Sequence, residues 1–481
     1  MNEIFNAING FLSNMLFFDI LFGQVEGTTI PFLVAWLIAG GIFLTIKMGF
    51  VNLKMLGHSY KVVSGKYHTK DDKGLITPFE SLTTALSATV GLGNIAGVAI
   101  AISIGGAGAT FWMIIAGFLG MTLKFVEVTL SVQHREFLKD GTIMGGGMEY
   151  LSKGLAQKGM SGFGKVLAIV FAIFMIGGAI GGGNTFQVSQ ALGVVQQEVP
   201  FLQEYPIIFG ITLALITGAV IIGGIKRIAH TTVKIVPAMV LIYVSASLWI
   251  LLTNFTQIPH AFALIFSEAF APTAVAGGMI GVIVQGFQRA VFSSEAGLGS
   301  AGIAHAPAKV KYPVRQGMVS LYEPFIDTIV VCTMTALVII ITGVYDPANG
   351  YKELIEAQQG AALTAAAYGT VIEWFPIILT ISIVLFAFST MISWSYYGER
   401  AWVYLFGAKY SLLFKLIFLS FTIMASIVST DILVDFSFML ILGMALPNIL
   451  GLYILSGDVK RALNLYLDKL KSGELDKESI K

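Results

Sequence analysis

Charged side chains are scarce in this sequence of 481 residues, because Asp, Glu, Lys and Arg together make up only 12% of it. A water-soluble domain usually carries about a quarter of its residues as charged side chains. Apolar residues reach 56%, and the mean hydropathy is +0.81. Most of the surface must therefore face lipid or other helices. This predicts one helical membrane bundle rather than the roughly three soluble domains that the length alone suggests.

The sequence also lacks the groups on which several functions depend. Its single cysteine, Cys332, lies in an apolar run, so disulfides and thiolate metal clusters are excluded. There is no P-loop, no H-E-x-x-H motif and no nucleophile–base–acid set, which argues against a membrane enzyme. There is no basic run with interleaved aromatics and the net charge is +1, so nucleic acid is not an expected partner. No feature indicates an obligate protein partner.

The first 18 residues do not have the pattern of a signal peptide, which needs a basic region followed by an A-x-A-like cleavage site. Apolar residues recur there at helical spacing, at Ile4, Ile8, Phe11, Leu12, Met15 and Leu16. We therefore expect residues 1–18 to form an amphipathic helix that lies in the membrane interface.

A membrane-spanning helix needs about 20 mostly apolar residues. Eleven segments of this kind occur, at about residues 30–49, 79–104, 109–132, 165–190, 206–223, 233–253, 272–293, 318–343, 372–398, 411–428 and 432–455. The expected fold is therefore an all-α polytopic membrane protein with about 11 transmembrane helices. Residues 461–481 are expected to form a charged tail in water.

Basic and acidic residues alternate between successive loops. One set of loops carries most of the basic residues, among them Lys54, Lys73, Lys153, Lys226 and Lys309. The opposite set carries acidic residues, among them Glu26, Glu198, Glu268, Asp346 and Glu373, with Lys352 as the clear exception. Because cytoplasmic loops are enriched in Lys and Arg, the N-terminus is expected outside the cell and the C-terminus in the cytoplasm.

The eleven spans can be divided into one leading helix, 30–49, and two halves of five, 79–253 and 272–455. An odd number of spans per half gives the halves opposite orientations, as an inverted-topology repeat requires. In such a repeat the binding site lies near the middle of the membrane, between broken helices. The count alone does not decide for the repeat, since ten is a common number of spans.

Glycine clusters occur in the first span of each half. The clusters are Gly91 and Gly93, beside Asn94, in the first half and Gly277, Gly278 and Gly281 in the second. Glycine costs up to about 1 kcal/mol in a helix interior, so these clusters predict helix breaks. The freed amides would suit a carboxylate and the freed carbonyls a cation. Close packing by small residues is the alternative, but the match between the halves favours breaks.

Polar and aromatic residues in other spans are candidates for the same site. Ser389 and Thr390 are adjacent in mid-span, and their hydroxyls either bind a small hard cation or bond back to their own helix. Trp394 either walls a small pocket, packs in the core or lies in the aromatic belt nearer the membrane surface. Asn184 and Gln187 share a helix face and, being costly in lipid, face the bundle, where they meet another helix or a substrate.

Charged residues within a membrane are functional candidates by default. Glu127, Glu323 and Asp327 fall within or near predicted spans. Arg289 and Glu295 are expected near the cytoplasmic end of their helix, where they would form a gating pair. No lone acid is expected at a mid-membrane glycine break, which disfavours a proton pump.

Four segments carry recognisable motifs. They are TALSATVGLGNIAGVA at 84–99, GGAGATFWM at 105–113, FSSEAGLGSA at 292–301 and WSYYGER at 394–400. Together they resemble the signatures of the alanine/glycine:cation symporter family, over about residues 20–460. Ala107 stands where the family usually has Pro, and Ser294 where it usually has Asn. Both are expected outside the pocket, where they bear on loop geometry.

The resemblance implies a LeuT-like fold of two inverted five-helix repeats, 79–253 and 272–455, with 30–49 as an extra helix in a single transporter domain, 19–460. It also implies symport of a small neutral amino acid, alanine or glycine, by alternating access across the inner membrane of a prokaryote, with Na+ as the coupling ion. A proton-coupled carrier remains an alternative, and an ion channel a more distant one.

Roles for individual residues follow from the same resemblance. The substrate would be held by peptide groups and side chains of Thr89, Gly91, Leu92, Gly93, Gln187, Gly278, Gly281, Thr390 and Trp394. Sodium would lie among the carbonyls of Ser87, Val90 and Phe386 and the hydroxyls of Ser389 and Thr390. Asn94 is the candidate for a second cation site.

Overall fold

The computed structural model describes residues 2–24, 29–138, 141–270 and 278–479, and almost all of its regular structure is helical. Two strands, β1 (Glu136–Phe137) and β2 (Ile143–Met144), pair in one short antiparallel hairpin. The prediction of an all-α fold is confirmed.

The helices of the first half include π-helices at η1, η2 and η3. They are α1 (Asn2–Leu16), α2 (Phe32–Met48), α3 (Val51–Lys54), α4 (Leu56–Val63), α5 (Pro78–Thr89), η1 (Gly93–Gly97), α6 (Val98–Gly105), α7 (Ala109–His134), α8 (Gly147–Glu149), η2 (Tyr150–Gly154), α9 (Leu155–Gln157), α10 (Ser161–Ile180), η3 (Gly181–Thr185), α11 (Phe186–Glu198), α12 (Phe201–Glu204), α13 (Pro206–Ile221) and α14 (Gly224–Thr253).

The helices after α14 include a π-helix at η5 and short 3-10 helices at η4, η6 and η7. Its helices are η4 (Phe255–Gln257), α15 (Ile258–Ala269), α16 (Gly278–Ser294), α17 (Ala301–His305), α18 (Pro313–Ser320), α19 (Tyr322–Pro324), η5 (Phe325–Cys332), α20 (Thr333–Thr342), η6 (Pro347–Asn349), α21 (Lys352–Glu356), α22 (Gly360–Gly369), α23 (Phe375–Phe406), η7 (Ala408–Tyr410), α24 (Ser411–Ala425), α25 (Thr430–Gly443), α26 (Ala445–Lys471) and α27 (Glu474–Glu478).

Many of these helices are long and apolar enough to cross a membrane. In the part of the chain that the structure describes, seven helical segments meet that test by length and composition, or eight when the bent pair of α5 with η1 and α6 counts as one span. Helices α2 and α13 are apolar but shorter, with 17 and 16 residues. The predicted span 272–293 starts outside the described residues and continues as α16. The count of eleven stays a prediction.

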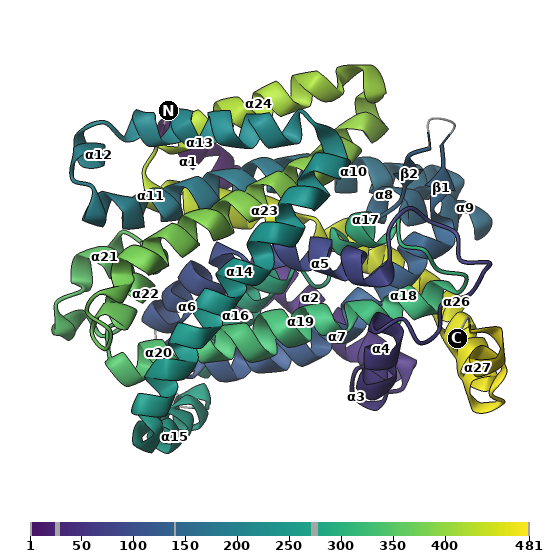
Figure 1. Ribbon diagram of the computed structural model, residues 1–481, viewed down its shortest axis with the longest axis horizontal. Helices are drawn as coiled ribbons and strands as arrows, with labels where there is room; N and C mark the ends of the chain where they lie inside the picture. Colours follow the sequence, from purple (N-terminus) through teal and green to yellow (C-terminus); the bar gives the residue numbers. More distant parts are fainter. Residues whose placement is uncertain (1, 25–28, 139–140, 271–277, 480–481) are drawn as a thin grey trace.

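The connecting segments gather at two opposite ends of the long helices. In Figure 1, α12, α21 and α22 lie at the left, while α4, α9, the β-hairpin and α27 lie at the right. Successive loops therefore alternate between two sides, as they do in a protein that crosses a membrane repeatedly.

The start of α5 is fixed by its own sequence. Thr77 accepts a hydrogen bond from the Glu80 amide at 3.1 Å, and the Glu80 side chain accepts one from the Thr77 amide at 2.7 Å. This capping box, with Pro78 in the first turn, satisfies amides that a helix N-terminus leaves free. The other end of α5 has no such side-chain cap and opens into the interior of the protein.

Both terminal segments fold onto the bundle. Helix α1 packs against α25, where the Asn9 side-chain amide donates to the Ile432 carbonyl at 3.2 Å. At the other end, α26 continues to Lys471, beyond the predicted span 432–455, and the buried Leu475 anchors α27. The interfacial position of residues 1–18 stays a prediction, whereas the predicted tail is helical and partly docked.

Candidate functional site

The first glycine cluster interrupts a helix, as the sequence predicts. Helix α5 ends at Thr89, and the chain resumes as η1 and α6 in a direction 53° away. At the break, the Gly91 amide donates to Asn94 Oδ1 at 2.9 Å and the Leu92 amide donates to Gln187 Oε1 at 3.4 Å. Side chains have thus replaced the helix carbonyls that these amides would otherwise meet.

The second break lies elsewhere than predicted. Helix α16 winds without interruption from Gly278 to Ser294, so the prediction of a break at Gly281 is wrong, and Gly277 lies outside the described residues. The helix ends instead before a segment with positive φ at Glu295 (56°), Gly297 (88°) and Gly299 (79°). Helix α17 begins only at Ala301.

Close packing explains a glycine inside α16. A Cβ atom on Gly286 would lie 2.6 Å from the Ala109 carbonyl oxygen, so this position serves the contact with α7. Gly281 is twelve residues from Ser293, which at a rise of 1.5 Å per residue is about 18 Å along the helix. The structure therefore places Gly281 away from both breaks, whereas Gly278, with a φ of 58°, is the first described residue of α16.

A small cavity lies between the first break and the end of α16. Its lining residues are Ala88, Thr89, Gly91, Gly93, Gly182, Gln187, Phe292, Ser293, Glu295, Thr390, Trp394 and Ile441. The volume open to the centre of a water-sized sphere is about 10 Å³, enough for about one water molecule. A larger solute needs the walls to move apart.

The structure brings most of the predicted substrate residues to this cavity. Thr89, Gly91, Gly93, Gln187, Thr390 and Trp394 line it, and Leu92 adjoins it through its amide bond to Gln187. Gly278 and Gly281 are absent from the lining, as their place on α16 requires. The sequence analysis missed Phe292, Ser293, Glu295, Gly182 and Ile441. The glycines that follow Glu295 in the third motif were the signal that could have found the second break.

Three π-helical segments meet at the cavity. Gly93 in η1 and Gly182 in η3 line it, and Asp327 in η5 contacts both η1 and the end of α16 through hydrogen bonds. A π-helix has irregular backbone bonding, is uncommon and occurs often at functional sites. Their convergence makes this region the candidate functional site.

The hydroxyl groups predicted for sodium lie together where α5 packs on α23. Ser87 Oγ is 3.0 Å from Ser393 Oγ and donates to the Ser389 carbonyl at 3.4 Å. Ser389 Oγ donates back to the Phe386 carbonyl at 3.0 Å, which is the alternative considered for this hydroxyl. Val90 stands at the end of α5, beside this contact.

Thr390 differs from its neighbour. Its Oγ1 atom is buried and has no hydrogen-bond partner among the residues that the structure describes. A Cβ atom on Gly91 would lie only 2.3 Å from it, so the hydroxyl reaches the first break because Gly91 has no side chain. Because Thr390 also lines the cavity, this hydroxyl is available to bond to a ligand there.

Trp394 forms one wall of the cavity. Its side chain is 2% exposed, and its Nε1 atom donates to Glu295 Oε1 at 2.9 Å. A Cβ atom on Gly183 would lie 2.3 Å from Trp394 Cβ, so the indole lies directly against the glycine-rich η3. Of the interpretations given to Trp394 from the sequence, a position in the wall of a pocket agrees with its place in the lining of the cavity.

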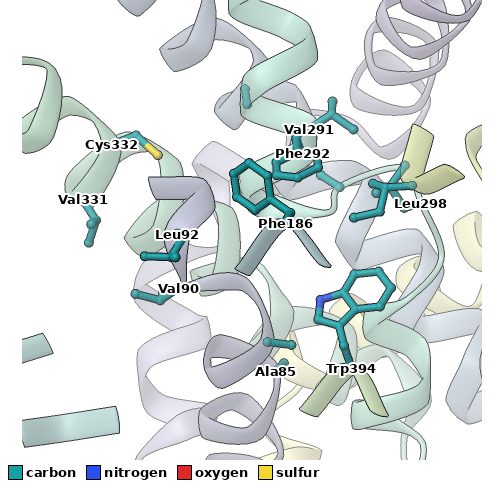
Figure 2. Packing of buried hydrophobic residues seen from close by; sticks show 14 of the residues in the cluster. Ala85, Val90, Leu92, Phe186, Val291, Phe292, Leu298, Val331, Cys332 and Trp394 are labelled. Carbon is teal, nitrogen blue, oxygen red and sulfur yellow. The ribbon is translucent and has the colours of Figure 1, made fainter. Parts of the chain in front are cut away.

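An aromatic group closes another side. The rings of Phe186 and Phe292 are 4.9 Å apart, and Phe292 stacks on Phe438 at 5.2 Å. In Figure 2, Val90 and Leu92 lie to the left of the Phe186 ring and Trp394 lies below it. Phe292 and Trp394 therefore line the cavity, while Phe186 and Phe438 pack against Phe292.

Asn94 belongs to a second polar cluster. Its Nδ2 atom donates to Asp327 Oδ1 at 2.6 Å, while Ser293 Oγ and Thr328 Oγ1 each donate to Asp327 Oδ2 at 2.9 Å. Asp327 is fully buried and, within the described ranges, forms no ion pair with a basic side chain. Because a buried anion must be compensated, this carboxylate suits a cation.

The two amide side chains of the fourth span, Asn184 and Gln187, have different kinds of partner. Asn184 bonds to α24, donating to the Phe418 carbonyl at 2.6 Å and accepting from Thr422 Oγ1 at 2.9 Å. Gln187 lines the cavity and donates to the Gly182 carbonyl at 2.9 Å. Asn184 therefore joins helices, whereas Gln187 belongs to the candidate site.

The expected gating pair is wrong. Arg289 lies over the Phe438 ring at 4.5 Å, whereas Glu295 bonds to Trp394 and to Ser300 Oγ. The expectation that no lone acid stands at a mid-membrane glycine break stays a prediction, but Glu295 does begin the break that runs to Ser300. A carboxylate therefore lies at the cavity itself.

Other buried charges support the second break. Glu127 Oε1 accepts from the Gly299 amide at 3.1 Å and from Asn448 Nδ2 at 2.7 Å. One turn before it on α7, Lys124 pairs with Glu323 Oε2 at 3.0 Å, and both are fully buried. These contacts tie α7 to the break and to α19.

Comparisons with known proteins identify the family of the chain. A profile of the sodium:alanine symporter family matches residues 15–480. The chain is 41% identical over 430 residues to a sodium/alanine symporter, AgcS, of Methanococcus maripaludis, covering 89% of this chain and 92% of that one. It is 31% identical over 451 residues to a probable sodium/glutamine symporter, GlnT, of Bacillus subtilis, covering 92% and 89%. It is 34% identical over 376 residues to a putative sodium/proton-dependent alanine carrier protein, YrbD, of Bacillus subtilis, covering 76% and 75%.

Proposed function

The chain belongs to the sodium:alanine symporter family, and we propose that it carries a small neutral amino acid, alanine or glycine, into the cell together with sodium. The observation that carries this proposal is the small cavity between the first break and the end of α16, beside an unpartnered hydroxyl. A site that opens to one side of the membrane at a time is how secondary transporters work. Membership of a transporter family supports a carrier rather than an enzyme.

The proposed architecture is a multi-pass membrane domain, 19–460, with a LeuT-like pair of inverted repeats, 79–253 and 272–455, after the extra helix 30–49. Breaks in the first helix of each half support it, at Val90–Leu92 and Glu295–Ser300. The alternation of basic and acidic loops supports an N-terminus outside and a C-terminus in the cytoplasm of a prokaryotic cell.

The substrate carboxylate is assigned to the amides of Leu92 and Gly93, beside Gly91. Its ammonium group is assigned to the Thr89 carbonyl and to carbonyls at the end of α16, which take the place given to Gly278 and Gly281. Gln187, Thr390 and Trp394 would complete the pocket. The small volume and the indole wall favour a short side chain.

Sodium is assigned to the contact between α5 and α23, among the carbonyls of Ser87, Val90 and Phe386 and the hydroxyls of Ser389 and Thr390. A sodium ion there would lock the two helices together and shape the pocket, so substrate and ion would tighten each other's binding by the same factor. Asn94, beside Asp327, is assigned to a second cation.

The proposal is tested by uptake of labelled amino acids into liposomes that contain the purified protein. An inward sodium gradient should drive saturable uptake of alanine and glycine, and replacing sodium with choline at constant pH should abolish it. Leucine should enter far more slowly. Equal uptake in choline would reject sodium coupling, and flux that does not saturate would indicate a channel.

Proton coupling is the second candidate, because Glu295 places a carboxylate at the cavity. The same liposomes in choline, with an inward proton gradient, separate the two candidates. Uptake under these conditions would make the proton the coupling ion.

Gly183→Ala should narrow the pocket, because the added methyl group would lie 2.3 Å from Trp394 Cβ and push the indole inward. We expect alanine uptake to fall about 10-fold or more, and the ratio of glycine to alanine uptake to rise, since a pocket distinguishes one methyl group by about this factor. Gly162→Ala on the neighbouring α10 meets nothing within 4 Å and is the control. A glycine-to-alanine ratio equal in both variants would contradict this account of the wall.

A further inference from the structure

We propose that Glu295 positions the indole of Trp394 and thereby sets the upper size limit of the amino acid that is carried. This inference rests on the proposed function. It assigns the size limit to a bond between the second helix break and α23, rather than to the bulk of Trp394 alone.

The backbone at Glu295 is unusual. Its φ of 56° lies in the left-handed region, which glycine adopts easily and other residues rarely do. Gly297 and Gly299, the other positive-φ positions of the same break, are glycines. Residues held in such a conformation cluster at ligand clamps and switch regions. A glutamate at this position indicates that its carboxylate makes contacts that offset the backbone strain, which glycine would avoid.

The carboxylate of Glu295 is held at both oxygens. Oε1 accepts from Trp394 Nε1 at 2.9 Å, and Oε2 accepts from Ser300 Oγ at 2.5 Å. The nearby cation Lys124 is paired with Glu323. With its orientation fixed from the start of α17, Glu295 can hold the indole at one angle.

Trp394 has no other polar anchor available. An indole has a single N–H donor, and this donor is used on Glu295. Its other contacts are apolar, with Gly183 of η3 and with the Tyr397 ring, whose centroid is 5.6 Å away. Loss of the bond to Glu295 would leave only these apolar contacts to set the angle of the ring, which would then shift and enlarge the cavity.

The bond also joins two parts that must approach each other when the cavity closes. Glu295 follows α16, whereas Trp394 belongs to α23. A side chain larger than that of alanine would push the indole away from the carboxylate and leave the pocket open. Selection by size would thus act on closure, so larger amino acids would bind without being carried.

The test compares four variants in the sodium-gradient liposome assay, with kcat/KM measured for alanine and for valine. Glu295→Ala removes the acceptor, Glu295→Gln keeps a carbonyl acceptor, and Trp394→Phe keeps a ring without the donor. We expect Glu295→Ala and Trp394→Phe each to lower the preference for alanine over valine about 10-fold. The fourth variant combines these two substitutions and should lower the preference no further. Glu295→Gln should retain the preference to within about 3-fold.

Two results would overturn the inference. One is an equal loss of alanine and valine uptake in Glu295→Ala, which would make the residue merely structural. The other is an additive effect in the double variant, which would show that the two side chains act separately. If Glu295→Ala does not fold, Trp394→Phe alone decides, since full preference in that variant rejects the bond as the cause. Absence of sodium-driven alanine uptake in the unmodified protein would instead reject the proposed function.

Discussion

Gly91→Ala is expected to reduce sodium-driven alanine uptake at least about 100-fold, the loss that a misplacement of about 1 Å at a working site can cause. The added Cβ atom would lie 2.3 Å from Thr390 Oγ1, well inside the normal contact distance. Either the Thr390 hydroxyl would have to turn away from the site or α5 and α23 would have to separate, at the point where substrate and sodium are assigned. Initial uptake rates, normalised to the amount of protein in the liposomes, measure the effect.

Gly97→Ala is the matched control for this prediction. Gly97 lies six residues further along, at the end of η1, and a Cβ atom there meets nothing within 4 Å. Both variants replace one buried glycine of the same span with the same residue. Uptake that survives in Gly91→Ala to the same extent as in Gly97→Ala would contradict the close approach of α5 to α23.

Thr390→Val is expected to raise the sodium concentration for half-maximal uptake at least about 10-fold, because one hydrogen bond or ion contact of a charged group contributes 1.5–3 kcal/mol. The substitution keeps the shape and removes the hydroxyl. That hydroxyl has no partner among the described residues, so the empty protein loses no internal hydrogen bond. Thermal unfolding without sodium should therefore show equal or greater stability, while the stabilisation by added sodium should shrink.

Thr380→Val on the same helix is the control, because the Thr380 hydroxyl already bonds to the Pro376 carbonyl at 2.8 Å. It should leave the sodium requirement unchanged. Reciprocity supplies a further check. In Thr390→Val, alanine should tighten sodium binding less than it does in the unmodified protein, and sodium should tighten alanine binding by the same reduced factor. An unchanged sodium requirement in Thr390→Val would remove this residue from the site.

The sequence was sufficient to predict the helical class, the approximate positions of the helices and the first break. At Gly91 and Gly93 the glycines stand beside Asn94, whose side chain bonds to a freed amide, and this local pattern is visible in one short segment. The matching residues on α23, Ser389 and Thr390, were visible as adjacent hydroxyls in an apolar span.

The second break was misplaced because glycine has two uses in a membrane helix. Gly286 gives α7 room to approach, whereas Gly297 and Gly299 adopt positive φ. Both uses leave the same letter in the sequence, and only the neighbouring helices distinguish them. Glu295 does lie at the end of its helix, as expected, but there it lines the cavity and bonds to Trp394.

The small volume of the cavity has a consequence for the energy that the cell spends to maintain its ion gradient. With Phe292 and Trp394 lining a space for about one water molecule, the cavity holds no column of water that ions could follow. A membrane can then hold many copies of the protein without short-circuiting its own ion gradient. Under the proposed function, a larger number of copies would raise the rate of amino-acid uptake. It would add little to the ion leak that the pumps of the cell must reverse.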